Sequence, residues 1–216
     1  LSADQFDRVT LLMMALEKIR KEGLFGKDEI TDSQIPFSSG LWVGQSMTPN
    51  TKKAAKDLLK NLRNNGFEAR GSFQIQACPW CKSSLTENVY EGYEFTNRDG
   101  FYFICPESQC DFGHSKLPIQ VVDEQLYEEP PTVLLATVDK FAQMSWKNEP
   151  AVFLGAKNNR PPSLIIQDEL HLISGPLGSI VGHYEVLIKQ IIQKFGRMPK
   201  IVASTATIRR AAEQVN

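Results

Sequence analysis

One stretch of the sequence joins an apolar run to side chains that can carry out phosphoryl chemistry. Residues 164–167 read Leu-Ile-Ile-Gln, and Asp168, Glu169 and His171 follow them. An apolar run of this length is typical of a buried strand in a parallel sheet, with the charges at the mouth of the sheet. There an aspartate can hold Mg²⁺ and a neighbouring glutamate can orient or deprotonate a water. An ordinary strand that ends in an acidic turn has a similar sequence, so this stretch alone leaves both interpretations open.

The phosphate-binding loop that such a carboxylate pair needs is not found in these 216 residues. No G-x-x-x-x-G-K-[ST] string occurs, and the nearest match, at 23–28, has the wrong spacing and ends in Asp28. If the carboxylates belong to a nucleotide site, this chain therefore holds only its metal and water half. The chain begins at Leu1 with a helical pattern already under way, so we expect it to be an excised segment.

Hydroxyl-bearing residues follow the next apolar strand pattern. Residues 201–203 are Ile-Val-Ala, and Ser204, Thr205 and Thr207 come directly after them. Their hydroxyls could bond to the carboxylates or to His171 and could sense a bound nucleotide, although Thr207 also suits the N-cap of a last helix. The ordered pair of strand ends favours a nucleotide-driven motor over an acidic turn.

The four cysteines form two close pairs, Cys78-x₂-Cys81 and Cys105-x₄-Cys110. Four thiolates at this spacing are typical of tetrahedral structural Zn²⁺, and the clustering favours a metal site in a reducing compartment over a disulfide framework. The residues between the pairs suit the hairpin of a zinc ribbon. We predict that the zinc stabilises a β-unit too small to bury enough core by itself. A further contact of this unit with nucleic acid or a partner stays open.

Strand and helix patterns alternate on both sides of the cysteine region. The predicted strands of the main sheet span 41–43, 133–136, 164–167 and 201–203, and the predicted helices span 2–23, 48–65, 138–145 and 177–195. Between 71 and 123 we predict short strands at 73–77, 89–95 and 101–104, with a turn at 97–100. This order predicts an α/β fold, in which helices cover both faces of a parallel sheet and a small β-module is inserted. The predicted segments are 1–70, 71–123 and 124–216.

Composition limits the classes of partner. Hydrophobic content of 42% and charged content of 23% are ordinary for a globular protein, and no apolar stretch could span a membrane. We expect a cytoplasmic protein with no membrane partner. The net charge of −1 gives no global attraction to nucleic acid, so any such contact must be local. Aromatic residues of the module could stack on bases but more often pack strands: Trp80, Tyr90, Tyr93, Phe95, Phe101, Tyr102 and Phe103.

In their order, these motifs resemble the first motor domain of superfamily 2 helicases. Residues 168–171, Asp-Glu-Leu-His, resemble motif II in its DExH form, and residues 205–207, Thr-Ala-Thr, resemble motif III. Residues 136–141 resemble the T-x-x-x-[LF] motif that touches the nucleic-acid backbone in this fold.

Looser strings extend the resemblance over nearly the whole chain, to the helicase subunits of DISARM antiphage systems (DrmA-like). They are Gly-Leu-Trp-Val-Gly at 40–44, Thr-Pro-Asn-Thr at 48–51, Cys-Pro-Trp-Cys at 78–81 and the segment 168–175. The resemblance implies a RecA-like sheet and an ATP-dependent helicase or translocase with a role in antiphage defence. It implies as partners nucleic acid, with DNA favoured, and defence-system subunits.

The resemblance also implies roles for particular residues. Asp168 would hold Mg²⁺ and Glu169 would activate water. His171, Ser204, Thr205 and Thr207 would couple ATP hydrolysis to strand movement. Thr137 and Lys140 would contact nucleic acid.

The phosphate-binding motif would precede Leu1, and a second RecA-like domain with an arginine finger would follow Asn216. The segment alone should therefore hydrolyse no ATP.

Two other functions stay open. The chain could be a non-catalytic adaptor that binds nucleic acid or protein through a degenerate motor fold stabilised by zinc. A phosphate loop upstream and an arginine finger downstream in the parent sequence would favour the motor over this adaptor. The chain could also be a redox protein that uses Cys78 and Cys81, and one bound zinc per chain would count against that.

Overall fold

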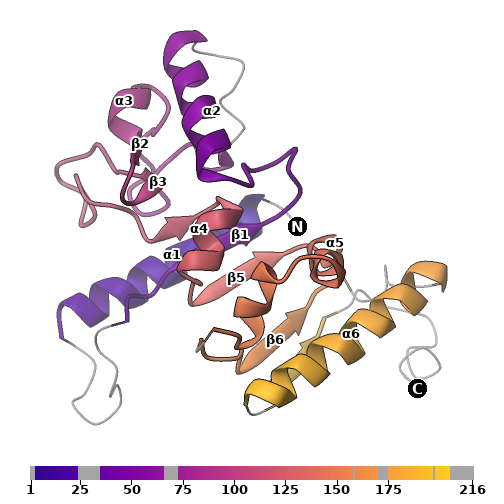
Figure 1. The fold of residues 1–216 in the computed structure, drawn as a ribbon. Coiled ribbons are helices and arrows are strands. Elements are labelled where there is room, and N and C mark those ends of the chain that lie inside the picture. Colours follow the sequence, from indigo (N-terminus) through magenta and orange to yellow (C-terminus); the bar gives the residue numbers. More distant parts are fainter. Residues whose placement is uncertain are drawn as a thin grey trace. The chain divides into compact units, whose positions relative to one another are not determined.

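The computed structural model divides the chain into two compact units, Leu1–Lys140 (unit 1) and Phe141–Asn216 (unit 2) (Figure 1). It describes residues 3–23, 35–65, 73–157, 159–169, 175–196 and 198–204.

A three-stranded parallel sheet lies at the centre of unit 1. Its middle strand is β1 (Ser39–Trp42), which hydrogen-bonds in parallel to β4 (Ile119–Gln120) on one side and to β5 (Val133–Ala136) on the other (Figure 1). All four residues of β1 are buried, as expected for the central strand of a covered parallel sheet. The predicted α/β fold with parallel strands is confirmed.

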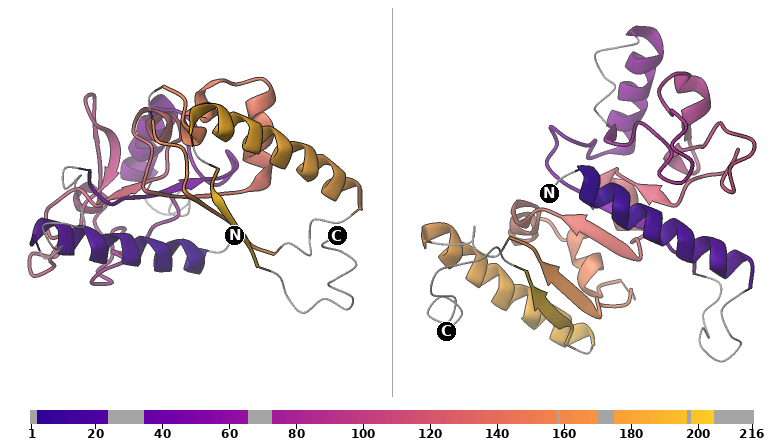
Figure 2. Two further views of the ribbon diagram at one scale, coloured as in Figure 1. Left: turned by 90° about the horizontal axis from the view of Figure 1, so that it is seen from below. Right: turned by 180° about the vertical axis from the view of Figure 1, so that it is seen from behind.

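Helices flank this sheet on both faces. In α1 (Ala3–Lys21), the Thr10 hydroxyl lies 2.9 Å from the hydroxyl of Ser39. A Cβ on the next residue, Gly40, would lie 2.6 Å from Leu126 of α4 (Asp123–Glu128). Because successive strand residues point to opposite faces, α1 and α4 cover opposite faces of β1 (Figure 1, Figure 2). The same Cβ would lie 2.6 Å from the Pro131 ring, so glycine at position 40 leaves room for both side chains.

Two further helices, α2 and α5, differ from their predicted ranges. α2 (Lys52–Asn65) begins four residues later than predicted, because the Thr51 hydroxyl accepts a hydrogen bond from the Ala54 amide and caps the helix there. α5 (Val138–Ala142) follows β5 and continues as the 3-10 turn η2 (Gln143–Ser145), so the predicted helix at 138–145 is two shorter turns.

The cysteine-bearing region contains the antiparallel hairpin of β2 (Tyr93–Thr96) and β3 (Gly100–Phe103), close to two of the predicted strands. The predicted strand at 89–95 is wrong in its first half, where α3 (Val89–Gly92) is helical because the Asn88 side chain accepts from the Tyr90 amide.

No strand forms over the predicted range 73–77. Gln74 has φ of 63°, and the Ile75 amide bonds to the Phe73 carbonyl at 2.8 Å, so the backbone turns there.

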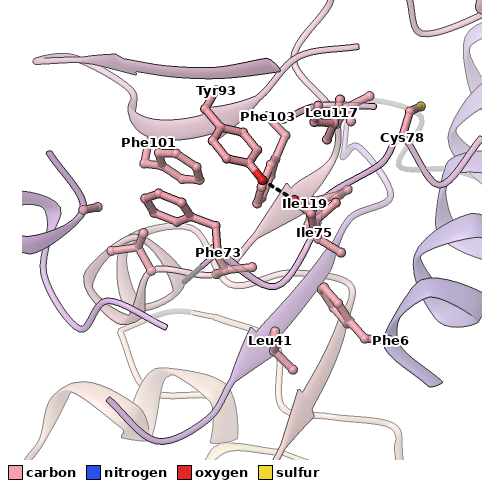
Figure 3. Packing of buried hydrophobic residues seen from close by; sticks show 14 of the residues in the cluster. Phe6, Leu41, Phe73, Ile75, Cys78, Tyr93, Phe101, Phe103, Leu117 and Ile119 are labelled. Atoms are coloured by element: carbon pink, nitrogen blue, oxygen red, sulfur yellow. Dashed lines mark hydrogen bonds between the residues drawn. The ribbon is translucent and has the colours of Figure 1, made fainter. Parts of the chain in front are cut away.

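An aromatic cluster joins this region to the sheet in one hydrophobic core (Figure 3). Phe73 stacks on Phe101 with ring centroids 3.9 Å apart, and Tyr93 meets both rings edge-on. The Tyr93 hydroxyl donates to the carbonyl of Ile75 at 2.5 Å. The same core includes Leu41 of β1 and Phe6 of α1. The segment boundaries at 70/71 and 123/124 stay predictions.

Unit 2 contains a parallel strand pair, β6 (Leu164–Gln167) and β7 (Lys200–Ala203), together with α6 (Gly175–Phe195) and the 3-10 segment η3 (Glu149–Leu154). The Gln167 side chain donates to Glu185 of α6 at 2.7 Å, so α6 lies on that face of the pair. The side chains of Leu164 and Ile166, which alternate with Gln167, are 48% and 65% exposed. The expectation that this strand is buried is therefore wrong for this chain.

Gly92 tests the packing between α3 and the preceding loop. A Cβ at Gly92 would lie 2.1 Å from the carbonyl oxygen of Leu85, a backbone atom that cannot rotate away. We expect Gly92→Ala to destabilise the protein by about 1–3 kcal/mol, measured by urea denaturation followed by circular dichroism. The matched control is Gly182→Ala in α6, where nothing lies within 4 Å and the change should be neutral or stabilising. Equal unfolding midpoints for the two variants would contradict this packing.

Candidate functional site

The four cysteine sulfurs converge in unit 1. The Sγ atoms of Cys78, Cys81, Cys105 and Cys110 all lie within 4.8 Å of one another, and those of Cys81 and Cys105 are 3.5 Å apart. All four cysteines are free thiols. Four thiolates about 2.3 Å from a common zinc ion lie about 3.8 Å apart, so the cluster suits a tetrahedral metal site.

Two backbone loops hold the sulfurs in place. In the first loop, the Lys82 amide donates to the Cys78 carbonyl and the Cys78 amide to the Ser83 carbonyl, each at 2.8 Å. In the second loop, the Gly113 amide donates to the Cys110 carbonyl at 2.7 Å. A Cβ at Gly113 would lie 2.3 Å from the Glu107 carbonyl oxygen, so this loop requires glycine there.

Burial sets the protonation of the thiols. Cys78 and Cys105 are buried in the hydrophobic core, and burial raises the pKa of Cys78 to about 11 and raises the pKa of Cys105 as well. Burial is also the largest single effect on Cys81, but hydrogen bonds from the hydroxyl and amide of Ser83, together with those from Cys105 and Cys110, lower the pKa of Cys81 to about 7. A metal ion that binds here must displace protons from the two buried thiols.

Residues beside the cysteines connect the two loops to α1. The Trp80 indole donates to the Asp111 carboxylate at 3.0 Å, and the ammonium of Lys18 in α1 lies 2.8 Å from the other oxygen of Asp111. The rings of Trp80 and Phe112 meet edge-on at 5.4 Å. Trp80 thus packs within the cysteine region, and neither Asp111 nor Lys18 was expected from the sequence to take part.

The predicted carboxylates follow β6 in unit 2. Asp168 and Glu169 are both exposed, and the Glu169 amide donates to the Asp168 carboxylate at 3.0 Å. Glu169 has φ of 55°, a left-handed conformation that is uncommon outside glycine. Because of this backbone conformation, the carboxylates of Asp168 and Glu169 are oriented differently from successive side chains of a regular strand.

One predicted partner of the carboxylates lies at the same end of the strand pair. Gln167 and Ala203 are paired in register, so Asp168 and Ser204 each follow the last pair. The Ser204 amide donates to the Gln167 carbonyl at 2.7 Å. His171, Thr205 and Thr207 lie outside the described residues.

Thr137 and Lys140, the predicted nucleic-acid contacts, follow β5. The Thr137 amide donates to the Trp42 carbonyl at 3.4 Å and the Thr137 carbonyl accepts from the Lys140 amide at 3.1 Å. Lys140 is 2% exposed and its ammonium lies 2.5 Å from Asp123 and 3.4 Å from the Asn50 side-chain oxygen. In this structure Lys140 therefore has a buried partner in place of the expected phosphate, whereas the role of Thr137 stays a prediction.

None of the described helices combines the length and the apolar character needed to cross a membrane.

Comparison with known proteins yields one relative. No protein-family profile matches the chain. The chain is 31% identical over 264 residues to the DISARM protein DrmA of Bacillus paralicheniformis. The comparison takes in 100% of this chain and 22% of that protein, so the chain spans about a fifth of the length of the relative. This similarity confirms the resemblance to DrmA-like proteins that the motif strings indicated.

The buried pair of Lys140 and Asp123 should be essential to unit 1. Lys140→Met leaves the Asp123 carboxylate buried without its cation, and we expect a loss of about 3–5 kcal/mol in the free energy of unfolding. Urea denaturation measures this loss, and the double variant Lys140→Met/Asp123→Leu should recover part of it. Lys147→Met, at an exposed lysine, is the control and should be nearly neutral. Equal stability of Lys140→Met and Lys147→Met would refute the buried pair.

Metal affinity at the cysteines should rise with pH. Below the raised pKa values of Cys78 and Cys105, a proton must leave each thiol before the metal binds, so protons compete more strongly as pH falls. Competition with a chromophoric zinc chelator between about pH 6 and 8 should show affinity that increases by about tenfold or more per unit. Metal analysis should find one zinc ion per chain in the wild-type protein and none in Cys78→Ser. A pH-independent affinity would contradict a site built on protonated thiols.

Proposed function

We propose that this chain is part of an ATP-dependent superfamily 2 DNA helicase or translocase that acts in antiphage defence. The observation that carries the proposal is the pair of carboxylates at the end of β6, beside Ser204 at the end of the paired strand β7. Parallel strands that end together in such groups are the usual place for a nucleotide site in an open α/β sheet. The similarity of the whole chain to a part of DISARM protein DrmA supports the same assignment and suggests the defence context.

In this proposal the residues divide the chemistry of phosphoryl transfer. Asp168 binds Mg²⁺, directly or through water, and Glu169 orients or deprotonates the attacking water. His171, Ser204, Thr205 and Thr207 couple the state of the nucleotide to the neighbouring loops. The grip on the phosphates and the arginine finger come from other parts of the intact protein, including a second RecA-like domain.

The cysteine cluster has a structural role in this proposal. Cys78, Cys81, Cys105 and Cys110 bind one Zn²⁺, which closes both loops over the core of unit 1. Four thiols that all converge on one point suit a closed structural site better than a redox pair, which needs two.

Glu169→Gln tests the catalytic role in the intact protein. Removing the group that activates water should lower kcat for ATP hydrolysis by about 10²-fold or more, with nucleotide affinity retained. Steady-state hydrolysis and nucleotide binding measure the two effects separately. Glu149→Gln, which neutralises another exposed carboxylate of unit 2, is the control and should hydrolyse ATP normally.

The competing function, an adaptor on a degenerate motor fold, gives the opposite result. An adaptor would bind nucleic acid or protein, yet the intact protein would show no ATP turnover that depends on Glu169. That outcome would remove the motor assignment and leave the zinc assignment in place.

A further inference from the structure

We propose that α2 and the neighbouring hairpin form a binding surface for single-stranded nucleic acid. This surface, called the basic face below, consists of Lys53, Lys56, Lys60 and Arg63 of α2 with Tyr90 and Phe95 beside them. The inference rests on the proposed function for its class of partner, and it adds a contact site that lies outside the strand-end motifs.

The period of the helix gathers the cations on one side of α2. Lys53, Lys56, Lys60 and Arg63 are spaced three, four and three residues apart, which places them within an arc of about 80°. Ala55, Leu59 and Leu62 are buried and anchor a different side of the helix in the core. Because the apolar side fixes the rotation of α2, the three lysines stay exposed to solvent.

Charge concentrates on α2 although the chain as a whole is slightly acidic. The 14 residues of this helix hold five lysines or arginines and one acidic residue, Asp57, whereas the whole chain has a net charge of −1. Lys52 forms an ion pair with Glu128. Among the residues that the structure describes, no ion pair is found for Lys53, Lys56 or Lys60. Their ammonium groups are therefore available to phosphates.

Aromatic rings lie directly beside these cations. The Arg63 guanidinium lies over the Tyr90 ring at 4.8 Å, and the Lys56 ammonium lies over the Phe95 ring at 5.4 Å. Arg63 also donates to the Tyr93 carbonyl at 2.8 Å, which fixes the guanidinium. The Tyr90 side chain is 63% exposed, so an unpaired base can stack against it while its phosphate meets a lysine.

Two carboxylates, Glu91 of α3 and Glu94 of the hairpin, limit the positive charge of this surface. The Glu94 carboxylate accepts from the Phe95 amide at 3.0 Å and lies 3.6 Å from Arg63, so it is engaged locally. Glu91 is the exposed carboxylate closest in sequence to Tyr90.

Nucleic acid fits the basic face better than a protein partner does. The centre of a protein interface is apolar and poor in lysine, whereas three lysines and a single strongly exposed ring make up most of this surface. Separate cations beside a stacking platform are the arrangement that binds single strands without base-specific hydrogen bonds.

Fluorescence anisotropy with a labelled oligothymidylate tests the basic face in the zinc-loaded chain. The triple variant Lys53→Gln/Lys56→Gln/Lys60→Gln should weaken binding by about tenfold or more at low salt. It should also reduce the slope of log affinity against log salt by about 2, because three phosphate contacts are lost. Tyr90→Ala should weaken binding by about fivefold or more and leave the salt slope unchanged, since stacking releases no counterion.

Matched controls in unit 2 remove the same charge and another exposed aromatic ring. Lys157→Gln/Lys194→Gln/Lys200→Gln and Trp146→Ala change exposed residues there and should bind like the wild-type chain. Unchanged far-ultraviolet circular dichroism shows that each variant is folded.

The outcomes separate this inference from the proposed function. Equal effects of the two triple variants, tighter binding of duplex than of single strand, or no binding by the wild-type chain would each overturn the basic face. If the motor assignment is correct, the intact protein still hydrolyses ATP in a way that depends on Glu169 after any of these results. The proposed function would be overturned by a different result, namely an intact protein with no ATP hydrolysis that depends on Glu169.

Discussion

The packing of Tyr93 against Phe73, Phe101 and Phe103 is the contact on which unit 1 depends. Tyr93 is wholly buried and its hydroxyl is satisfied by the Ile75 carbonyl, so the ring can lie deep in the core without an unpaired polar group (Figure 3). Cys78 and Cys105 belong to the same core. The cysteine cluster is thus partly an extension of hydrophobic packing, and the burial that positions two of its sulfurs also raises their pKa values.

Two polar contacts extend this core to the rest of unit 1. At one side, Lys18 binds Asp111, one residue after Cys110. At the other, Asp123 binds Lys140 in a fully buried pair. Breaking a buried pair costs far more than breaking an exposed one, so the second contact constrains the segment after β5 more strongly than the first constrains α1. The cysteine region therefore packs as part of unit 1.

Local patterns in the sequence predicted the strands β1, β5, β6 and β7 closely. These strands are indicated by apolar runs and turn residues that lie within a few positions of one another. The same patterns failed where distant residues decide the outcome. Lys140 finds its partner 17 residues away, which no short motif indicates. At Val89–Gly92 they failed for a local reason, because the Asn88 side chain caps a helical turn where a strand was predicted. The apolar residues at 164–167 predicted a strand, but they could not predict whether other segments would cover Leu164 and Ile166.

The same core fixes the position of the aromatic ring on the basic face. Tyr90 lies on the single turn of α3. Asn88 caps the start of this turn, and Gly92 at its end packs tightly against the Leu85 carbonyl. The next residue, Tyr93, is the centre of the aromatic core, and its carbonyl accepts from Arg63. A metal ion bound by the four cysteines would close their loops and stabilise that core, which in turn holds the ring and the guanidinium together. The proposed zinc site and the proposed nucleic-acid surface would therefore be linked through one set of packed side chains, although no residue of the basic face is a metal ligand.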